Sequence, residues 1–171
     1  MAYNMGLGLA YGSNLHLCKK KWRWMFTIPD VCGNTSVNIL APQKSARPDL
    51  RWKEINIQHL NEEVFFPGKP DWSMASITLY DTKLTAHPLF RWLRTMYGPQ
   101  DGSYMRTPKD GFIKECRLDM YDGCGNVIEQ WIYEDAWPQQ MNFNDLDMGA
   151  NEFVVCNLML RYARAYIVEN Q

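Results

Sequence analysis

Five acidic side chains gather around one short segment and could supply catalytic carboxylates. Two carboxylates on either side of a glycosidic bond hydrolyse it, one as the acid and the other as nucleophile or base. The five acids belong to one predicted hairpin, so their proximity needs no catalytic explanation, and acids on strand faces are mostly solvated. We therefore expect solvated strand faces and no enzyme activity. The five are Asp119, Asp122, Glu129, Glu134 and Asp135.

Metal and cofactor chemistry is not indicated either. His16, His59 and His87 are scattered, and none of the five cysteines forms a C-x-x-C pair, so no zinc spacing appears. Asp145 and Asp147 match half of a calcium loop, but the glycine and terminal glutamate do not follow. A Walker loop, a nucleophile elbow and a G-x-G-x-x-G are absent from the sequence. We predict no cofactor and no metal.

The cysteines and the N-terminal segment bear on the compartment. An odd number of cysteines without a signal peptide favours reduced thiols in the cytosol, and the basic cluster 19–21 follows the weakly apolar stretch instead of preceding it. A chain that later leaves the cell could still form disulfides between copies, for which we name Cys18, Cys32 and Cys124. No run is long enough for a membrane helix.

Composition limits the kind of partner. The chain of 171 residues fits one domain, and its net charge of −1 lacks the basic excess of a tight nucleic-acid binder. The aromatic fraction of 13%, with seven Trp and nine Tyr, is high. Aromatic side chains fill β cores and are also enriched at interfaces. Both readings stay open: a tryptophan-rich core, or a chain that associates with copies of itself.

The first half of the chain predicts strands and one long loop. Residues 1–17 read as an N-terminal arm, either flexible or docked on a neighbouring subunit. Segments 21–28 and 35–40 form a hairpin. Residues 42–52 contain two prolines and mixed charge, which predicts a loop. Residues 53–60 alternate as a strand with one buried face and one wet face, and a short partner strand ends at Pro67-Gly68.

The second half adds a strand, a helix and a hairpin. Residues 73–80 alternate with Ala75, Ile77 and Leu79 inward. Helical spacing over 85–97 predicts a helix with Thr85 as N-cap, Leu89 and Trp92 in the core, and a stop at Gly98-Pro99. Segments 112–121 and 127–134 form a hairpin around the turn 122–126.

The closing block runs from residue 136 to 168. A Trp137-Pro138 turn, a Leu146-Asp147 pair and an Asn151-Glu152 turn lead into a strand with an apolar even face, and its pattern extends to residue 168. About eight strands and one helix result. We predict a mainly β fold: an antiparallel β-sandwich or partly closed barrel with one flanking helix, whose unpaired edges are completed by assembly.

A family resemblance rests on these residues. The closing strand has the form Leu-x-Leu-x-Tyr-x-x-x-Tyr (Leu158 to Tyr166), after the turns at 137–138 and 151–152. Trp72 and the phrase Ile77-Thr78-Leu79-Tyr80-Asp81 precede it. Together with the opening hairpin, they resemble the tail tube proteins of contractile-tailed phages and the related Hcp rings. The long Gly-rich N-terminus and the cysteine content depart from that pattern.

The resemblance implies a structural virion protein. Tail tubes are stacked hexameric rings with a β-barrel lumen inside a contractile sheath, and double-stranded DNA passes through them. The expected partners are further copies, sheath, baseplate and tail terminator proteins, and the expected location is the virion after assembly in the host cytoplasm. The family's loop after the opening hairpin contacts the next ring, which corresponds to residues 42–52 here.

Two sets of residues follow as candidates. The lumen-facing set lies on regular polar strand faces and comprises Glu54, Asn56, Gln58, Glu115, Arg117, Asp119 and Gln130. The contact set combines the predicted loop with nearby aromatic residues and comprises Lys44, Arg47, Leu50, Arg51, Trp52, Trp72 and Trp137. Two alternatives remain: an Hcp-like tube of a secretion system, or a monomeric β-sandwich that binds a glycan through Trp22, Trp52, Trp72 and Trp137.

Overall fold

Ten strands and one helix occupy the described part of the chain. The computed structural model describes residues 19–29, 37–38, 42–100, 102–103, 111–122 and 124–168. The strands are β1 (Trp24–Ile28), β2 (Val37–Asn38), β3 (Pro42–Ser45), β4 (Leu50–His59), β5 (Glu62–Trp72), β6 (Ala75–Tyr80), β7 (Lys114–Tyr121), β8 (Val127–Asn142), β9 (Val155–Arg161) and β10 (Arg164–Ile167), and the helix is α1 (Lys83–Met96). The predicted mainly β class with one flanking helix is confirmed.

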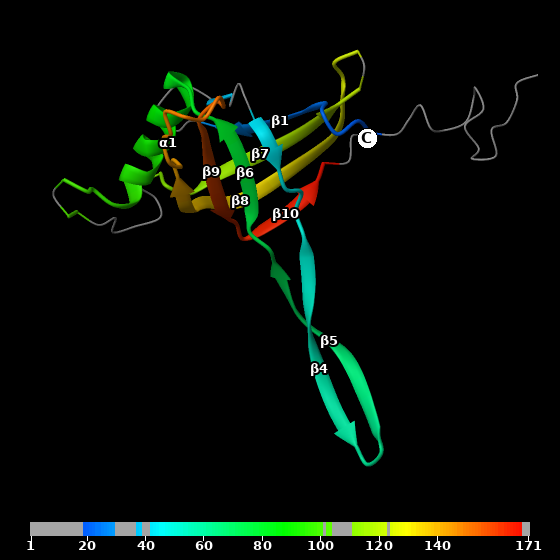
Figure 1. Cartoon of the computed structure of the whole chain (residues 1–171). Helices are drawn as coiled ribbons and strands as arrows, with labels where there is room; N and C mark the ends of the chain where they lie inside the picture. The colour runs from blue at the N-terminus through cyan, green and yellow to red at the C-terminus, as the bar shows by residue number, and fades with distance from the viewer. Residues whose placement is uncertain are drawn as a thin grey trace, which may run out of the picture.

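Eight of the strands form one antiparallel sheet, which we call the body sheet (Figure 1). Its order is β2-β1-β7-β8-β9-β6-β3, and β10 pairs with β8. The sixteen-residue β8 joins the two halves: its first part lies between β7 and β10, and residues 137–142 pair with β9. The halves meet near Asp135, whose φ is 53°. The path is not closed into a barrel, because β2 and β3 do not pair with each other.

The core lies on the inward side of the body sheet, where alternate residues are apolar. Phe26 and Ile28 of β1, the even face of β9 and the three predicted residues of β6 are buried. Full burial of one such side chain stabilises the fold by about 1.5–3 kcal/mol. The period-two pattern of these strands therefore gave the correct inward faces.

Helix α1 packs its apolar side on this core. Leu89 and Trp92 are fully buried, and the Trp92 indole donates a hydrogen bond to the Phe112 carbonyl (2.6 Å). The predicted stop before Gly98-Pro99 is confirmed. The predicted cap is wrong: Thr82 is the N-cap, and Thr85 lies inside the helix.

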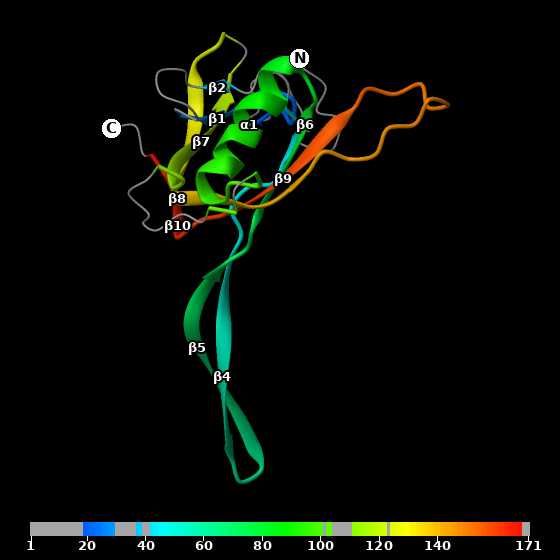
Figure 2. The ribbon, with the colours of Figure 1, turned by 90° about the vertical axis from the view of Figure 1, so that its left-hand side faces the viewer.

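Strands β4 and β5 form a separate two-stranded hairpin that projects from the body (Figures 1 and 2). Three predictions change here. Residues 42–52 are not one loop, since β3 and the start of β4 occupy most of them. Strand β4 has no buried face in the chain, because residues 51–58 are all exposed. Strand β5 runs through Pro67-Gly68, where a register shift in the hairpin accommodates the proline.

The closing block also differs from its prediction. Trp137-Pro138 is not a turn but part of β8, and the proline sits beside a register shift between Pro138 and Gln140. The predicted long final strand is broken at residues 162–163 into β9 and β10. The break lets the two strands follow β8 through its bend.

Candidate assembly surface

The projecting hairpin is amphipathic. Residues directly opposite each other on an antiparallel pair share a face. Ile55 lies opposite Phe66 and Ile57 lies opposite Val64, which makes one face apolar. The other face carries the predicted lumen residues Glu54, Asn56 and Gln58, together with Glu63 and Phe65. The Glu63 carboxylate accepts hydrogen bonds from the Asn56 and Gln58 amides (3.4 and 3.5 Å).

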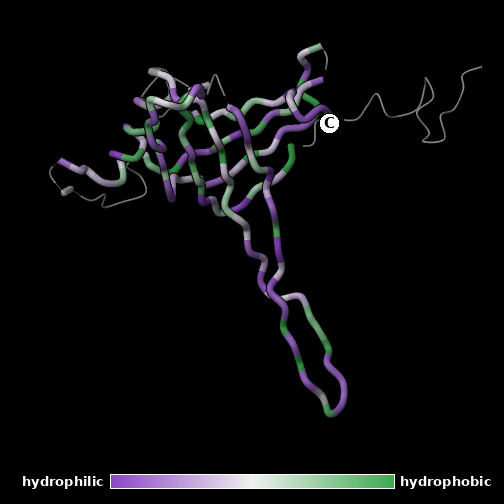
Figure 3. Tube along the Cα trace, viewed as in Figure 1, coloured by the Kyte–Doolittle hydropathy of each residue, from purple (hydrophilic) through white to green (hydrophobic). Residues whose placement is uncertain are grey.

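The apolar face is not covered by any described part of the chain. Its four side chains keep 42–51% of their surface exposed, and Leu60 at the tip keeps 94%. Figure 3 shows hydrophobic positions along the projecting hairpin, which extends away from the body. An isolated two-stranded hairpin is at best marginally stable in water. Exposed apolar surface of this kind marks a contact site for another molecule.

Polar and aromatic contacts fix the root of the hairpin to the body. Asp49 accepts hydrogen bonds from the Ser73 hydroxyl and the Arg51 guanidinium (both 3.0 Å), and its carbonyl accepts from the Ser73 amide (2.9 Å). The Trp72 ring packs against Tyr162, with 5.8 Å between the centroids. The hairpin therefore leaves the body in a defined direction.

A second ion pair and a glycine hold the chain near this root. Arg161 of β9 lies 3.4 Å from Asp71. A Cβ at Gly68 would come within 2.5 Å of the Lys53 carbonyl oxygen, so only glycine fits at the register shift. These contacts are consistent with a stiff arm at least as far as residue 68.

The predicted contact residues occupy three places. Leu50 and Trp72 face each other at the hairpin root, with Arg51 beside them, and Trp52 is 57% exposed on the arm. Lys44 is exposed on β3, and Arg47 lies between β3 and β4. Trp137 is half-buried in β8. The structure thus brings together the residues from 50 to 52 with Trp72, and it leaves Trp137 on the body.

The remaining lumen candidates lie on the outward face of the body sheet. Glu115 pairs with Arg117 (2.9 Å), and Gln130 of β8 donates to Asp119 of β7 (2.7 Å). Register places Tyr166 of β10 on the same face, because Arg117 and Tyr166 both lie opposite Ile132. This polar face is separate from the hairpin. The two groups of lumen candidates are therefore not on one continuous strand face.

The face is balanced in charge. Its ionic groups include two pairs, Glu115 with Arg117 and Glu134 with Arg164, together with Asp119 and with Arg23, which lies opposite Tyr121. Such a surface offers little to hold a phosphate backbone.

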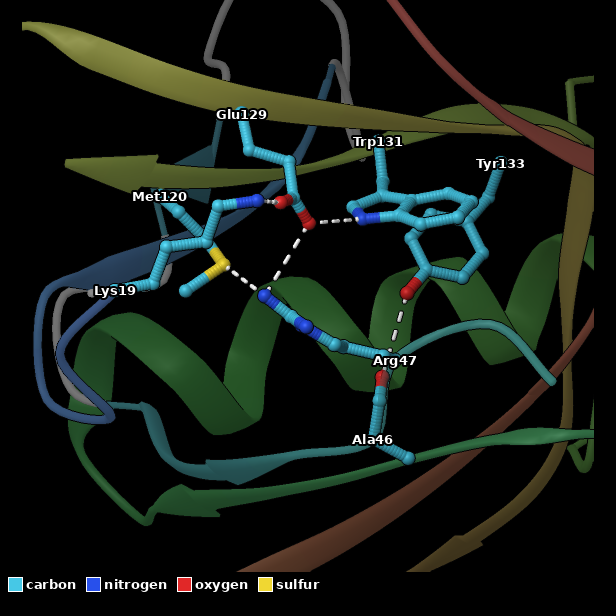
Figure 4. Close-up of polar contacts among 7 residues, drawn as sticks. All are labelled: Lys19, Ala46, Arg47, Met120, Glu129, Trp131 and Tyr133. Carbon is cyan, nitrogen blue, oxygen red and sulfur yellow. Dashed lines mark hydrogen bonds and ion pairs between the residues drawn. The ribbon is translucent and has the colours of Figure 1, made fainter. Parts of the chain in front are cut away.

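One of the five acids is not solvated. Glu129 of β8 is 7% exposed and points to the core side with Trp131 and Tyr133 (Figure 4). Its carboxylate accepts a hydrogen bond from the Trp131 indole and forms ion pairs with Lys19 and with Arg47 (3.3 Å). The prediction that all five acids lie on solvated faces is wrong at this position. Its parity, shared with Trp131 and Tyr133, was the signal in the sequence.

The Glu129 cluster anchors the segment that leads into the hairpin. Arg47 also contacts the Met120 sulfur, and the Tyr133 hydroxyl donates to the Ala46 carbonyl (3.3 Å). Burial, and then the nearby Tyr162, raises the pKa of Tyr133, so the hydroxyl keeps its proton. Residues 46–47 are thereby tied to β8 just before β4 begins.

Three of the other candidate acids form local hydrogen bonds or ion pairs. Gln130 donates to Asp119, Asn126 donates to Asp122, and Arg164 pairs with Glu134. Hydrogen bonds from Asn126 lower the pKa of Asp122 and stabilise the β7–β8 turn. In the described ranges no group of His, Cys, Asp and Glu has the arrangement of a metal site. Within the same ranges, α1 is too short to cross a membrane.

The described cysteines have free thiols. Cys116 and Cys156 are buried and Cys124 is exposed at the β7–β8 turn. Burial raises the pKa of Cys116 and Cys156, and nearby carboxylates (Glu115 and Asp81) add to the effect. Of the cysteines named for disulfides between copies, only Cys124 is described, since residues 18 and 32 lie outside the described ranges.

Comparison of the sequence with known proteins gives one informative relative. No protein-family model matches the chain. A tail tube protein of Serratia phage KSP90 is 24% identical over 152 residues, and the alignment covers 85% of each chain. The chain thus aligns over most of its length with a protein named for the tail tube.

Comparison of the fold gives the same class of protein. The anti-feeding prophage tube terminating cap superposes with a TM-score of 0.68 at 14% identity, covering 90% of this chain and 92% of that one. The tube–sheath complex of an extracellular contractile injection system, PVC, gives 0.66 at 13% identity, with 92% and 97% covered. Hcp1 from Flavobacterium johnsoniae gives 0.53 at 11% identity, with 85% and 94% covered. The chain has the tail-tube and Hcp-like fold, and the resemblance predicted from the sequence is confirmed.

Proposed function

We propose that this chain is a structural subunit of a phage tail tube, in which copies form rings and the rings stack into a hollow conduit. The observation that carries this proposal is the hairpin β4–β5, whose apolar face is left open by every described residue of its own chain. The sequence and fold similarities to tube proteins support the same role. No catalytic step is part of it.

The arm packs on another copy. Its apolar face holds Ile55, Ile57, Val64 and Phe66, all about half exposed. When a neighbouring subunit covers these side chains, their apolar surface is removed from water. This burial stabilises the contact by about 25 cal/mol per Å² of apolar area. In a stacked tube the neighbour is a copy in the next ring, the role that the family resemblance implies for residues 42–52. Our proposal assigns the main contact to the projecting hairpin, because its apolar face is open.

The body sheet completes its ring through its edges. Within the described residues, β2, β3 and β10 each have one strand partner, and β2 and β10 are the outer strands of the half that carries the polar face. Six copies joined edge to edge would form a continuous barrel, which removes the hazard of open strand edges. The face with Glu115, Arg117 and Asp119 then lines the passage.

The lining suits the transit of double-stranded DNA. Each phosphate contact by Lys or Arg would add affinity and slow movement. On this face Arg117 and Arg164 are both paired with glutamates. The expected partners are a sheath, baseplate and terminator proteins, and the expected setting is the virion after assembly in the host cytoplasm.

An Hcp-like tube of a secretion system remains the second candidate, because the chain shares the fold of Hcp1. The two functions use the same ring and differ in what passes through it. The glycan-binding alternative finds less support: Trp72 packs against the core and Trp137 is half-buried, so only Trp22 and Trp52 are mainly exposed.

Sedimentation of the purified full chain at rising concentration tests the proposal. We expect a species of about six subunits, followed by faster-sedimenting tubes. A constant monomer mass at every concentration would refute the tube function in both of its forms.

A further inference from the structure

A basic pocket opens at one end of the body sheet. It has a volume of about 880 Å³ and lies between β1, β3 and β7. Its lining includes the cations Lys21, Lys44 and Arg47 and the apolar side chains of Trp24, Leu118 and Met120. Arg47 and the adjacent Lys19 share the buried Glu129, whereas Lys21 and Lys44 form no ion pair with any carboxylate in the described ranges. The pocket therefore has unneutralised positive charge above an apolar surface.

An acidic loop projects from the other end of the sheet. It comprises residues 143–154 between β8 and β9, and Figure 2 shows it extending from the body on the right, whereas the β7–β8 turn points to the top of the view. Leu146 and Met148 are almost fully exposed (82% and 108%). Asp145 and Glu152 are exposed beside them, and no described cation pairs with either. The loop is opposite in charge to the pocket, because its carboxylates lie beside two exposed apolar side chains.

Pocket and loop lie at opposite ends of β8. The pocket borders Met120, opposite Glu129 near the start of β8, and the loop begins just after Asn142, where β8 ends. A contact between the loop of one copy and the pocket of the next therefore joins two different surfaces. Such a heterologous contact can be repeated from copy to copy, in a ring or in a stack, because it is not completed within one pair.

We infer that the acidic loop of one subunit inserts into the basic pocket of a second copy of this chain, with Leu146 and Met148 against the apolar lining and Asp145 and Glu152 beside Lys21 and Lys44. The loop follows one end of β8 and the pocket borders the other, so the contact joins two copies through different surfaces. The inference rests on the proposed tube function and adds a contact between copies that is distinct from the hairpin.

Charge-reversed variants test the contact. Variant A carries Asp145→Lys and Glu152→Lys, and variant B carries Lys21→Glu and Lys44→Glu. All four side chains are exposed, so folding is unaffected. Asp147 is left unchanged because its carboxylate accepts a hydrogen bond from the Gly149 amide (2.8 Å). A variant with Arg91→Glu and Arg94→Glu on the exposed side of α1 has the charge change of variant B and serves as control.

Each variant alone places like charges at every loop–pocket contact, whereas a mixture offers opposite charges at every contact between A and B. We expect A alone and B alone to give at least about tenfold fewer tubes than the wild type in negative stain. An equimolar mixture elongates again, and the control behaves like the wild type.

Other outcomes are equally decisive. If A and B each elongate like the wild type, or if their mixture fails to elongate, the loop does not occupy the pocket, and another partner such as sheath or terminator protein remains to be sought there. A control that loses tubes as strongly as B would also overturn the assignment. Absence of rings from the wild type would instead contradict the proposed function.

Discussion

Ile55 faces Phe66 across the β4–β5 hairpin, and each keeps about half of its surface exposed. Replacing both with threonine preserves the β propensity and removes apolar contact area. We expect tube yield to fall at least about tenfold while the thermal unfolding of the body changes little, because neither side chain touches the core. Electron microscopy counts the tubes, and circular dichroism follows unfolding.

The opposite face supplies the control for that change. Gln58→Thr with Glu63→Thr alters a directly opposed pair on the polar side of the same hairpin. This variant should keep tube yield within about twofold of the wild type. Equal losses in both double variants would mean that the hairpin fold, and not its apolar face, is what assembly requires.

Trp52 and Trp92 separate assembly from folding. Trp52 is 57% exposed on the arm, whereas Trp92 of α1 is fully buried in the core. Trp52→Ala should impair polymerisation with little effect on the free energy of unfolding. Trp92→Ala removes a core side chain and should lower that free energy by about 3–5 kcal/mol. Unaltered tube yield in Trp52→Ala would count against its place in the contact.

Much of the body could be predicted from sequence, because its strands alternate against a core that the chain itself supplies. Strands β6, β7 and β9 show this, and α1 follows from Leu89 and Trp92. The hairpin could not be predicted, for a physical reason. Ile55 and Ile57 alternate like core residues, but what covers them is not in the chain, and no pattern within one sequence distinguishes a core from an absent partner.

The errors at prolines and at Glu129 have local causes. Residue type predicts a strand end at Pro67 and a turn at Pro138, but both prolines sit beside register shifts where a missing amide proton does no harm. Residue type also predicts a solvated Glu129, but its parity matches Trp131 and Tyr133. Its partners Lys19 and Arg47 are distant in sequence, so their ion pairs were not visible before the fold was known.

Removing Glu129 should weaken the anchor at the base of the arm. Glu129→Ala leaves the Trp131 indole and the Arg47 guanidinium without their acceptor. We expect the free energy of unfolding in urea to fall by about 1–3 kcal/mol. Glu115→Ala breaks the solvent-exposed pair with Arg117 and should cost less than about 1 kcal/mol. Similar losses of unfolding free energy in the two variants would show that the buried Glu129 contacts stabilise the fold no more than an exposed ion pair does.

The thiols should react in an order set by burial. Thiolate is the reactive form, and burial raises the pKa of Cys116 and Cys156, so both stay protonated in the fold. In a Cys18→Ser, Cys32→Ser background at pH 8, one equivalent of a thiol reagent should label Cys124, and the other two should react only on unfolding. Mass spectrometry of peptides reads the sites, and early labelling of Cys116 would contradict its placement.

Because of the same two thiols, the fold should become less stable at alkaline pH. Their pKa values are raised on folding. Their contribution to the free energy of unfolding is therefore fully present below the ordinary thiol pKa of 9.0 and is lost as pH rises above it. We expect the unfolding midpoint to fall from pH 9 upward more steeply than in a Cys116→Ala variant. Parallel pH profiles for the two proteins would contradict this.

Reversing charge on the proposed lining should make the conduit bind DNA. Glu115→Lys with Asp119→Lys changes two acids on the polar face to cations. Tubes of this variant should retain double-stranded DNA at low salt and release it as salt increases, whereas wild-type tubes should retain little. Identical DNA retention by the two kinds of tube would place this face away from the passage.

The most direct measurement of the central claim is a negative-stain image of the purified full chain at high concentration. The account predicts annular particles with six-fold symmetry and an open centre, stacked into tubes. A field of solitary, ring-free particles at the highest soluble concentration would contradict it.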